Sequence, residues 1–244
     1  MPRFFVSADL LACDKPVLDG ENAAHIKVLR LSRGESITLC DGCGTEAQCV
    51  IDDFADKQVL LHVQSRNAAV SEPKLQCSVY MGFPKADKFE HVVQKATELG
   101  AAEIVIFPCE RSISRPDPKS LSKKLERWQK IAVSAAEQSG RGRIPTVLAL
   151  DSFEAAVRRA CATELPLLFY ENERTRSLRA AAGEKTFASA AIMTGPEGGL
   201  TPQEVQKAMD AGMQVCSLGP RILRCETAPL CALSALLYHT GDLD

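Results

Sequence analysis

Thr194-Gly195-Pro196-Glu197-Gly198-Gly199-Leu200-Thr201-Pro202 is the stretch that decides how this chain folds, and Leu218-Gly219-Pro220-Arg221-Ile222-Leu223-Arg224-Cys225-Glu226-Thr227-Ala228 is its counterpart. Each stretch follows a short apolar run typical of a strand and precedes a helical pattern. Glycine lets a backbone approach a ligand closely, and proline restricts the path of a loop. Two such loops predict a site built mostly from main chain. That site suits a flat, adenosine-like ligand and leaves charged side chains for a second substrate.

Strand and helix patterns alternate from about residue 75 onwards. The apolar runs predict strands over 75–81, 103–108, 144–150, 165–170, 190–194 and 214–218. The intervening periodicity predicts helices over 88–99, 120–139, 153–161, 202–211 and 227–238. Thr201 and Glu204 form a capping-box pattern around Pro202, which fixes one helix start. This α/β alternation indicates a mostly parallel sheet covered on both faces.

The first 70 residues have a different pattern and look β-rich. Short strands are expected over 4–6, 36–40, 47–51 and 59–63, with one or two helical turns near 25–29. The small, polar, proline-closed segment 67–73 is interpreted as a linker. We therefore expect a β-rich domain over residues 1–70 and an α/β domain over residues 75–244.

The composition is that of an ordinary globular protein: 244 residues, 45% hydrophobic and 25% charged. No apolar run approaches the ~20 residues of a membrane helix. The opening, Met1-Pro2-Arg3-Phe4-Phe5-Val6, lacks the long apolar stretch of a signal peptide. We therefore expect a cytoplasmic protein with no membrane partner, whose ten cysteines are reduced.

A zinc site is suggested by Cys40-x-x-Cys43 with Cys49 nearby. However, Asp41-Gly42-Cys43-Gly44 fits a hairpin turn better, and no second ligand pair has zinc-site spacing. We predict no metal site.

Basic residues concentrate in one stretch although the net charge is only −2. A solvated helix face is the usual reason for such a run, and a phosphate-contacting surface is the alternative. Taken alone, the run favours the solvated face. Its members are Arg111, Arg115, Lys119, Lys123, Lys124, Arg127, Lys130, Arg141 and Arg143.

Ligands of parallel α/β sheets bind beyond the carboxyl ends of the strands. Three such ends stand out: 169–172, 195–199 and 218–224. None carries a dinucleotide fingerprint, and the chain has no P-loop sequence. A nucleoside would therefore be held by another arrangement.

Six ordered motifs give the chain a resemblance to the uridine-N3 methyltransferases of 16S ribosomal RNA, the RsmE family of the SPOUT superfamily. The motifs are Arg3-Phe4-Phe5; 25–31 with Gly34-Glu35; 94–100; Glu110-Arg111-Ser112; 127–132 through 137–141; and the two loops 195–199 and 218–228. The chain departs from the family pattern at Cys225, where threonine is usual, and at Ala86, where glycine is expected.

The resemblance implies a fold, a cofactor and partners. It implies a PUA-like β-barrel domain that assists RNA binding, and a SPOUT domain with a C-terminal trefoil knot. It implies that S-adenosylmethionine binds in the knot of a homodimer. It also implies that the substrate is 16S rRNA, within the small ribosomal subunit. Rival classes are a silent RNA-binding or ribosome-assembly protein on the same scaffold, and a nucleotide-dependent oxidoreductase or hydrolase, which the missing fingerprints disfavour.

Site residues follow from the resemblance and the strand ends. Arg221 and Arg224 are predicted catalytic cations, because uracil N3 must lose a proton before it attacks and a cation stabilises the anion. Glu226 is the third predicted catalytic residue, although Glu197 and Glu171 are alternative proton acceptors and Glu226 also suits a helix start.

Cofactor and RNA contacts complete the predicted site. The predicted cofactor contacts are Phe169, Tyr170, Glu171, Thr194, Gly195, Glu197, Gly198, Gly199, Leu218, Gly219, Ile222, Leu223, Arg224, Thr227 and Ala228. The predicted RNA contacts are Arg3, His25, Arg30, Arg111, Arg115, Gln138 and Arg141.

Overall fold

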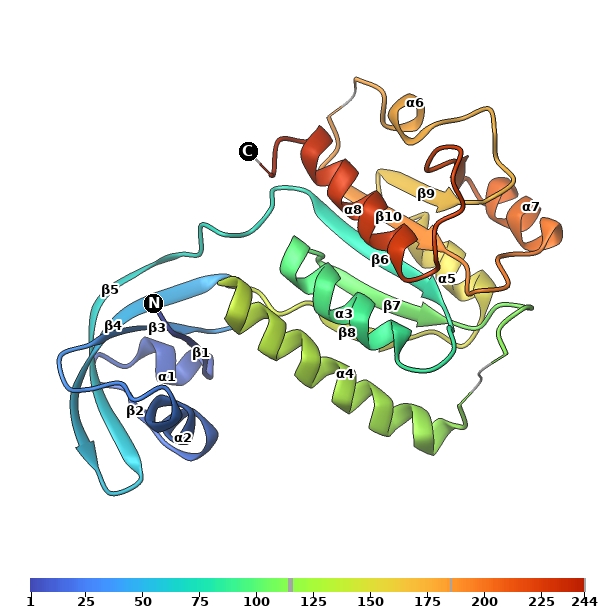
Figure 1. Ribbon diagram of the computed structural model, residues 1–244. Helices are drawn as coiled ribbons and strands as arrows, with labels where there is room; N and C mark the ends of the chain where they lie inside the picture. Colours follow the sequence, from blue (N-terminus) through green and yellow to red (C-terminus); the bar gives the residue numbers. More distant parts are fainter. Residues whose placement is uncertain (114–115, 185, 244) are drawn as a thin grey trace. The chain divides into compact units, whose positions relative to one another are not determined.

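The computed structural model describes residues 1–113, 116–184 and 186–243 (Figure 1). The chain divides into two compact units. The smaller comprises Met1–Glu72 and Ala136–Ile144, and the larger comprises Pro73–Ala135 and Pro145–Asp244. The smaller unit therefore takes in a second segment from the middle of the chain. The domain boundary predicted between residues 70 and 75 stays a prediction.

A six-stranded sheet, with every strand pair parallel, forms the centre of the larger unit. Its strands lie in the order β11-β9-β10-β6-β7-β8. Their bounds are β6 (Gln76–Gly82), β7 (Glu103–Phe107), β8 (Thr146–Ala149), β9 (Leu165–Phe169), β10 (Ser189–Thr194) and β11 (Gln214–Cys216). The α/β class and the parallel sheet predicted from the sequence are confirmed.

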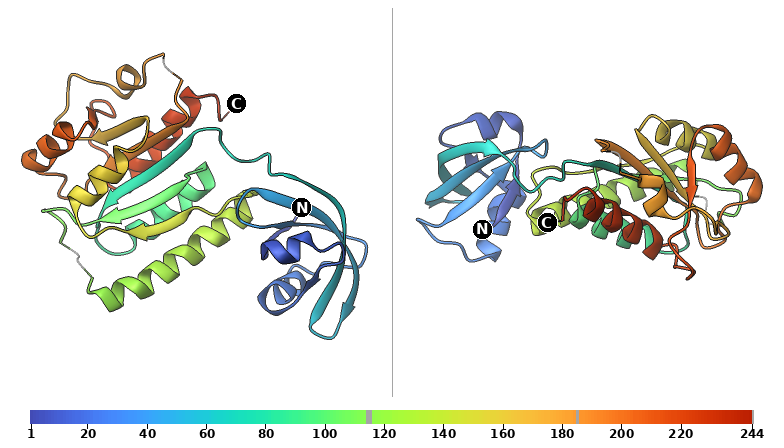
Figure 2. Two further views of the ribbon diagram at one scale, coloured as in Figure 1. Left: turned by 180° about the vertical axis from the view of Figure 1, so that it is seen from behind. Right: turned by 90° about the horizontal axis from the view of Figure 1, so that it is seen from above.

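Helices cover both faces of this sheet, as its apolar strands require (Figure 2). Helix α3 (Lys88–Leu99) and helix α8 (Thr227–His239) pack together on one face. Helix α5 (Phe153–Ala160) and helix α7 (Pro202–Asp210) pack together on the other. The remaining helices after β6 are α4 (Pro118–Ser139) and α6 (Leu178–Ala182).

The predicted helices have the packing that their periodicity implied. In α5, Ala156 and Val157 are buried in a core cluster with Phe107 of β7. On the other face, Trp128 of α4 packs edge-on against Phe89, with ring centroids 4.7 Å apart. The capping box at Thr201 is present. The helix start predicted from the capping-box pattern is therefore confirmed.

The smaller unit contains a mixed sheet in the order β1-β3-β4-β5-β2. Strands β1 and β3 pair in parallel, and the other neighbours are antiparallel. Its elements are β1 (Arg3–Phe5), α1 (Ala8–Ala12), β2 (Val17–Leu18), α2 (Gly20–Val28), β3 (Ser36–Cys40), β4 (Thr45–Ala55) and β5 (Gln58–Ala68). The β3–β4 hairpin turn is as predicted: Asp41 Oδ1 accepts from the backbone N–H of Cys43 at 2.7 Å.

Four short or flanking elements differ from the sequence-based expectation. Helices α1 and α6 and strand β2 were not predicted, because five or fewer residues show no measurable periodicity. The linker prediction is wrong for residues 67 and 68, which pair with Glu46 and Thr45 as the end of β5. The trefoil knot implied by the resemblance stays a prediction. Within the described ranges, no helix has both the length and the apolar character needed to cross a membrane.

Candidate cofactor and substrate site

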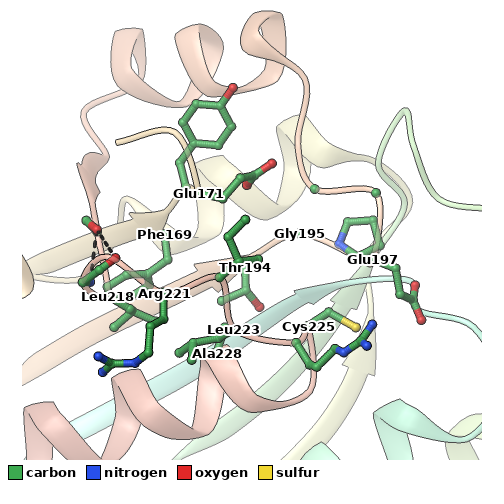
Figure 3. A pocket seen from close by; sticks show the side chains of 18 of the residues that line it. Phe169, Glu171, Thr194, Gly195, Glu197, Leu218, Arg221, Leu223, Cys225 and Ala228 are labelled. Atoms are coloured by element: carbon green, nitrogen blue, oxygen red, sulfur yellow. Dashed lines mark hydrogen bonds between the residues drawn. The ribbon is translucent and has the colours of Figure 1, made fainter. Parts of the chain in front are cut away.

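The candidate site is a pocket of about 340 Å³ in the larger unit (Figure 3). It lies at the carboxyl ends of β9, β10 and β11, which are neighbours in the sheet. Phe169 ends β9 and Thr194 ends β10, and both line the pocket. Because carboxyl ends of parallel strands share one sheet edge, three loops distant in sequence contribute to one cavity.

The structure brings together most residues that the sequence placed at this site. Of the predicted cofactor residues, Thr227 alone lies outside the pocket lining. Those that line it are Phe169, Tyr170, Glu171, Thr194, Gly195, Glu197, Gly198, Gly199, Leu218, Gly219, Ile222, Leu223, Arg224 and Ala228. Of the predicted catalytic residues, Arg221 and Arg224 line the pocket and Glu226 does not.

The loop after β10 needs glycine at two positions. Gly199 has a φ of +68°, and a Cβ there would collide with the carboxylate of Glu171. At Gly195, a Cβ would come within 2.9 Å of the carbonyl carbon of Gly199. The N–H of Gly199 closes the turn by donating to the carbonyl of Pro196 at 2.9 Å. The loop is therefore a tight turn whose shape excludes side chains at both positions.

The carboxylate of Glu197 fixes this loop to the start of α3. It accepts hydrogen bonds from the backbone N–H of Lys85, at 3.0 and 3.2 Å, and pairs with Lys88 Nζ at 2.9 Å. The same ammonium group lies 3.4 Å from Glu226 Oε2 and 3.8 Å from the sulfur of Cys225. Lys88 thus bridges the loop after β10 and the turn that begins α8.

These contacts set the charge states of both carboxylates. Burial alone would raise the pKa of Glu197, but hydrogen bonds from Lys88 and from backbone N–H groups hold it below its usual value. At Glu226, burial is likewise outweighed, by hydrogen bonds from its own backbone and from the Cys225 thiol, and its pKa is also lowered. The hydrogen bond to Glu197 raises the pKa of Lys88. Burial and the nearby Glu226 raise the pKa of Cys225 to about 12.

Arg111 supports the same loop from another side. Its Nη1 donates to the carbonyls of Gly198 at 3.0 Å and Leu200 at 3.4 Å. A Cβ on Gly198 would lie 3.1 Å from the Cβ of Arg111. Arg111, which was predicted to contact RNA, therefore donates hydrogen bonds from its guanidinium group to the backbone of this loop.

The loop after β11 has fewer such ties. Ser217 Oγ accepts from the backbone N–H of Gly219 at 3.1 Å, shown as a dashed line in Figure 3. Beyond Gly219, which has a φ of +97°, Arg221 and Arg224 are exposed and Ile222 is 80% exposed. Figure 3 shows Arg221 and Glu197 at opposite ends of the pocket.

Comparisons with known proteins agree with this geometry. The family described as "RNA methyltransferase domain" matches residues 71–237, and "RNA methyltransferase PUA domain" matches residues 18–64. The ribosomal RNA small subunit methyltransferase E of Bacillus subtilis is 38% identical over 91% of this chain and 90% of its own length. The chain belongs to this methyltransferase family. The family resemblance and the PUA-like character of the smaller unit are thereby confirmed.

Two solved structures of the family are similar over their whole length. The methyltransferase E of Neisseria gonorrhoeae, bound to S-adenosyl methionine, is 31% identical with a TM-score of 0.84, covering 98% of each chain. A methyltransferase of Legionella pneumophila, in complex with the same cofactor, is 30% identical with a TM-score of 0.85, covering 97% of each chain. The fold of this family member is therefore that of proteins crystallised with S-adenosylmethionine.

The predicted RNA contacts are placed unevenly. His25, Arg30 and Gln138 are exposed. Arg3 pairs with Glu46 at 2.8 Å, and its side chain is only 13% exposed. Arg115 lies outside the described residues.

Arg141 is placed differently from its sequence-based expectation. Its side chain is 4% exposed and pairs with Glu72 at 2.7 Å. Because this guanidinium is buried against a carboxylate, its placement favours a structural role in this family member over the predicted phosphate contact.

Five residues near the site were not among the predicted site residues. Arg174, Pro196, Ser217 and Cys225 line the pocket, and Lys88 bridges its loops. Ser217 directly precedes the predicted contact Leu218. Starting the predicted loop one residue earlier would have included it. Lys88 has no sequence signal beyond the start of a helix, since its partners lie more than 100 residues away.

Proposed function

We propose that this protein transfers the methyl group of S-adenosylmethionine to N3 of a uridine in 16S rRNA of the small ribosomal subunit. Family membership supports the reaction class. One observation of the chain itself carries the proposal: a main-chain-lined pocket at three strand ends has two exposed arginines, Arg221 and Arg224, in its lining.

The pocket fits the cofactor by size and by lining. Its volume of about 340 Å³ lies within the range of small-molecule sites. The turn at Gly195 and Gly199 leaves backbone groups bare for a nucleoside, and Leu218 and Leu223 offer apolar side chains for an adenine. Glu171 offers a carboxylate for the cofactor's hydroxyl or ammonium groups. We therefore assign the cofactor to the predicted contacts that line the pocket, apart from Arg224, whose side chain we assign to the RNA substrate.

The chemistry is a displacement that this chain assists by position and charge. S-adenosylmethionine supplies a methyl group on a sulfonium, which N3 takes up while the carbon–sulfur bond breaks and its electron pair stays on sulfur. The guanidinium of Arg224 stabilises the uracil anion left when N3 loses its proton. Arg221, on the same loop, is placed to hold the uracil edge or an adjoining phosphate.

In this proposal the proton of N3 leaves to solvent. Glu226 does not line the pocket, and both Glu226 and Glu197 bind Lys88 and have lowered pKa values. Carboxylates held in that way are weak bases and are already engaged. We therefore propose that Glu226 and Glu197 act by holding loops, in place of the catalytic role predicted for Glu226.

Partners and location follow from the substrate. We propose that the β-rich domain of residues 1–70 assists rRNA binding, that residues 75–244 carry the reaction, and that the protein works in the cytoplasm. A homodimer is the assembly proposed from the family resemblance. Analytical ultracentrifugation tests this assembly.

The decisive experiment is in vitro methylation of unmodified 16S rRNA and of small subunits lacking the modification. Nucleoside mass spectrometry is expected to find N3-methyluridine at one position. Methylation at another atom, or on another RNA only, contradicts the proposal. Cofactor binding without any methylation, measured by titration calorimetry, would favour the silent RNA-binding alternative.

A further inference from the structure

Five exposed arginines belong to two chain segments that contribute to the pocket. Arg221 and Arg224 belong to the loop after β11, and Arg174, Arg176 and Arg179 belong to the segment between β9 and α6 or to α6 itself. Within the part of the chain that the structure describes, none of these five guanidinium groups has an ion pair or hydrogen bond. Arg3 and Arg141, by contrast, are paired with carboxylates.

Backbone contacts bring the two segments together. The N–H of Ser217 donates to the carbonyl of Arg176 at 2.8 Å, and Ser177 forms an isolated parallel bridge with Ser217. Arg174, Arg221 and Arg224 line the cofactor pocket, and Arg179 lines the cavity beside it, of about 710 Å³, which shares Ser217 through Gly219 with the pocket. Arg176 is joined through its backbone to Ser217, which lines both cavities.

Three carboxylates accompany the five arginines, and they leave an excess of positive charge. Glu171 lines the pocket next to the Gly199 turn, and Glu197 lines it as well but pairs with Lys88. Glu173 is turned back on its own segment, where hydrogen bonds from Thr175 and the backbone lower its pKa to about 2. Its hydrogen bond with the N–H of Arg176 at 3.0 Å also shapes the segment that presents the arginines.

We propose that the 174–179 segment is a docking surface for rRNA phosphates flanking the target uridine, with Arg176 and Arg179 as phosphate ligands; this rests on the proposed function. Neither residue lines the cofactor pocket, so neither is placed to bind the cofactor's carboxylate. Guanidinium groups bind phosphate oxygens in pairs of hydrogen bonds, and an unpaired group loses no protein contact when it does so. The phosphate surface therefore lies beside the reacting base, apart from the basic stretch that the sequence suggested.

The test is the salt dependence of RNA binding. Each phosphate contact contributes about 0.7 to 0.9 to the slope of log affinity against log salt. We expect Arg176→Gln with Arg179→Gln to lower that slope by about 1.4 to 1.8 for unmodified 16S rRNA. Calorimetric affinity for S-adenosylmethionine should stay at the wild-type value. The matched control is Arg158→Gln on α5, an exposed arginine on the opposite face of the sheet, which should leave the slope unchanged.

The outcomes separate this inference from the proposed function. A wild-type slope in the double variant overturns the docking surface, whether or not the enzyme methylates rRNA. A change in sedimentation from one assembly state to another also overturns it, because it identifies the arginines as a subunit contact. If the wild-type enzyme binds rRNA but methylates no uridine, the proposed function fails, while the measured slope still decides the docking surface.

Discussion

The two cofactor loops differ in how the rest of the protein holds them. The loop after β10 is supported on one side by Lys85 and Lys88 through Glu197, and on another by Arg111. The loop after β11 is held at its two ends, by Ser217, which binds Arg176 and Gly219, and by Lys88, which contacts Cys225 and Glu226. Between those ends, Arg221 and Arg224 are exposed. Both loops line the same pocket.

This difference indicates that the site has two parts: the loop after β10 is preformed, and the loop after β11 is adaptable. A turn held by charge-assisted hydrogen bonds has its shape before the ligand arrives, which reduces the ordering that binding must impose. A loop with exposed, unpaired arginines keeps its charges available for a second substrate. Lys88 connects the two, because its ammonium group also contacts Glu226.

The largest expected effect comes from destroying the preformed turn. We expect Gly199→Val to abolish S-adenosylmethionine binding in calorimetry, since valine at a φ of +68° is strained and its side chain collides with Glu171. The control is Gly212→Val, which has a φ of +104° but no atom within 4 Å of its Cβ. Equal loss of binding in both variants would show that backbone strain alone, and not the pocket, is responsible.

The adaptable loop should govern the chemical step. We expect Arg224→Ala to reduce single-turnover methylation by about 10²–10³, the usual result of removing one preorganised donor. Cofactor affinity should remain near the wild-type value. The lost rate should return in part as pH rises, because more uracil is then deprotonated without the arginine. A variant that turns over normally, or that fails only because it cannot bind cofactor, would make Arg224 structural and direct attention to Arg221.

Removing the bridge between the loops should affect both functions moderately. We expect Lys88→Met to weaken cofactor affinity and single-turnover rate by about tenfold each, the scale of one lost hydrogen bond to a charged group. Lys88→Arg should restore most of both. Lys95→Met is the control, since Lys95 on the same helix pairs only with Glu98 at i,i+3 among the described residues. Tenfold losses in the control as well would mean that α3 is simply sensitive to charge.

The same bridge gives a stability difference with a defined pH window. Because the pKa values of Glu197 and Glu226 are lowered from 4.5, their stabilisation is present above about that pH and is lost as pH falls through the lowered values. Because the pKa of Lys88 is raised from 10.5, the contribution of Lys88 to the free energy of unfolding is lost only as pH rises above that value. Chemical denaturation should therefore separate wild type from Lys88→Met at pH 7 and show convergence near pH 3. A difference that persists at low pH contradicts the ionic origin.

The smallest effect tests the backbone before α3. Ala86 has a φ of +53°, a conformation that costs a non-glycine residue about 1–2 kcal/mol. Ala86→Gly should raise Tm by about 2–4 °C, as expected for ~1 kcal/mol in a chain of this size. Ala86→Val should lower it. Stabilisation by valine would show that the strain is absent in solution.

The sequence predicted those features that local chemistry determines. Helix α3 begins and ends where its apolar period does, at Lys88 and Leu99, and the capping box at Thr201 marked α7. The part of the site that lies at strand ends was predictable, because loops containing glycine and proline after apolar runs can be recognised in the sequence alone.

Pairing between distant residues could not be predicted. Nothing in the sequence connects Arg141 with Glu72, or Lys88 with both Glu197 and Glu226, yet these pairings decide which charges are available to a substrate. Nothing in the sequence distinguishes Arg176 and Arg179 from the other lysines and arginines, 29 in all. The fold places Arg179 in the cavity next to the pocket and joins the backbone of Arg176 to Ser217.

The packing of Trp128 provides an intrinsic fluorescence probe near the start of α3. It is the only tryptophan in the sequence, and its indole lies edge-on against Phe89, the residue that follows Lys88. The loop after β10 is joined to the start of α3 through Glu197, which accepts from the backbone N–H of Lys85 and pairs with Lys88. We therefore expect a movement of that loop on cofactor binding to alter the surroundings of the indole. Intrinsic emission should therefore follow cofactor arrival without a label, in stopped-flow time, and Lys88→Met should silence the signal.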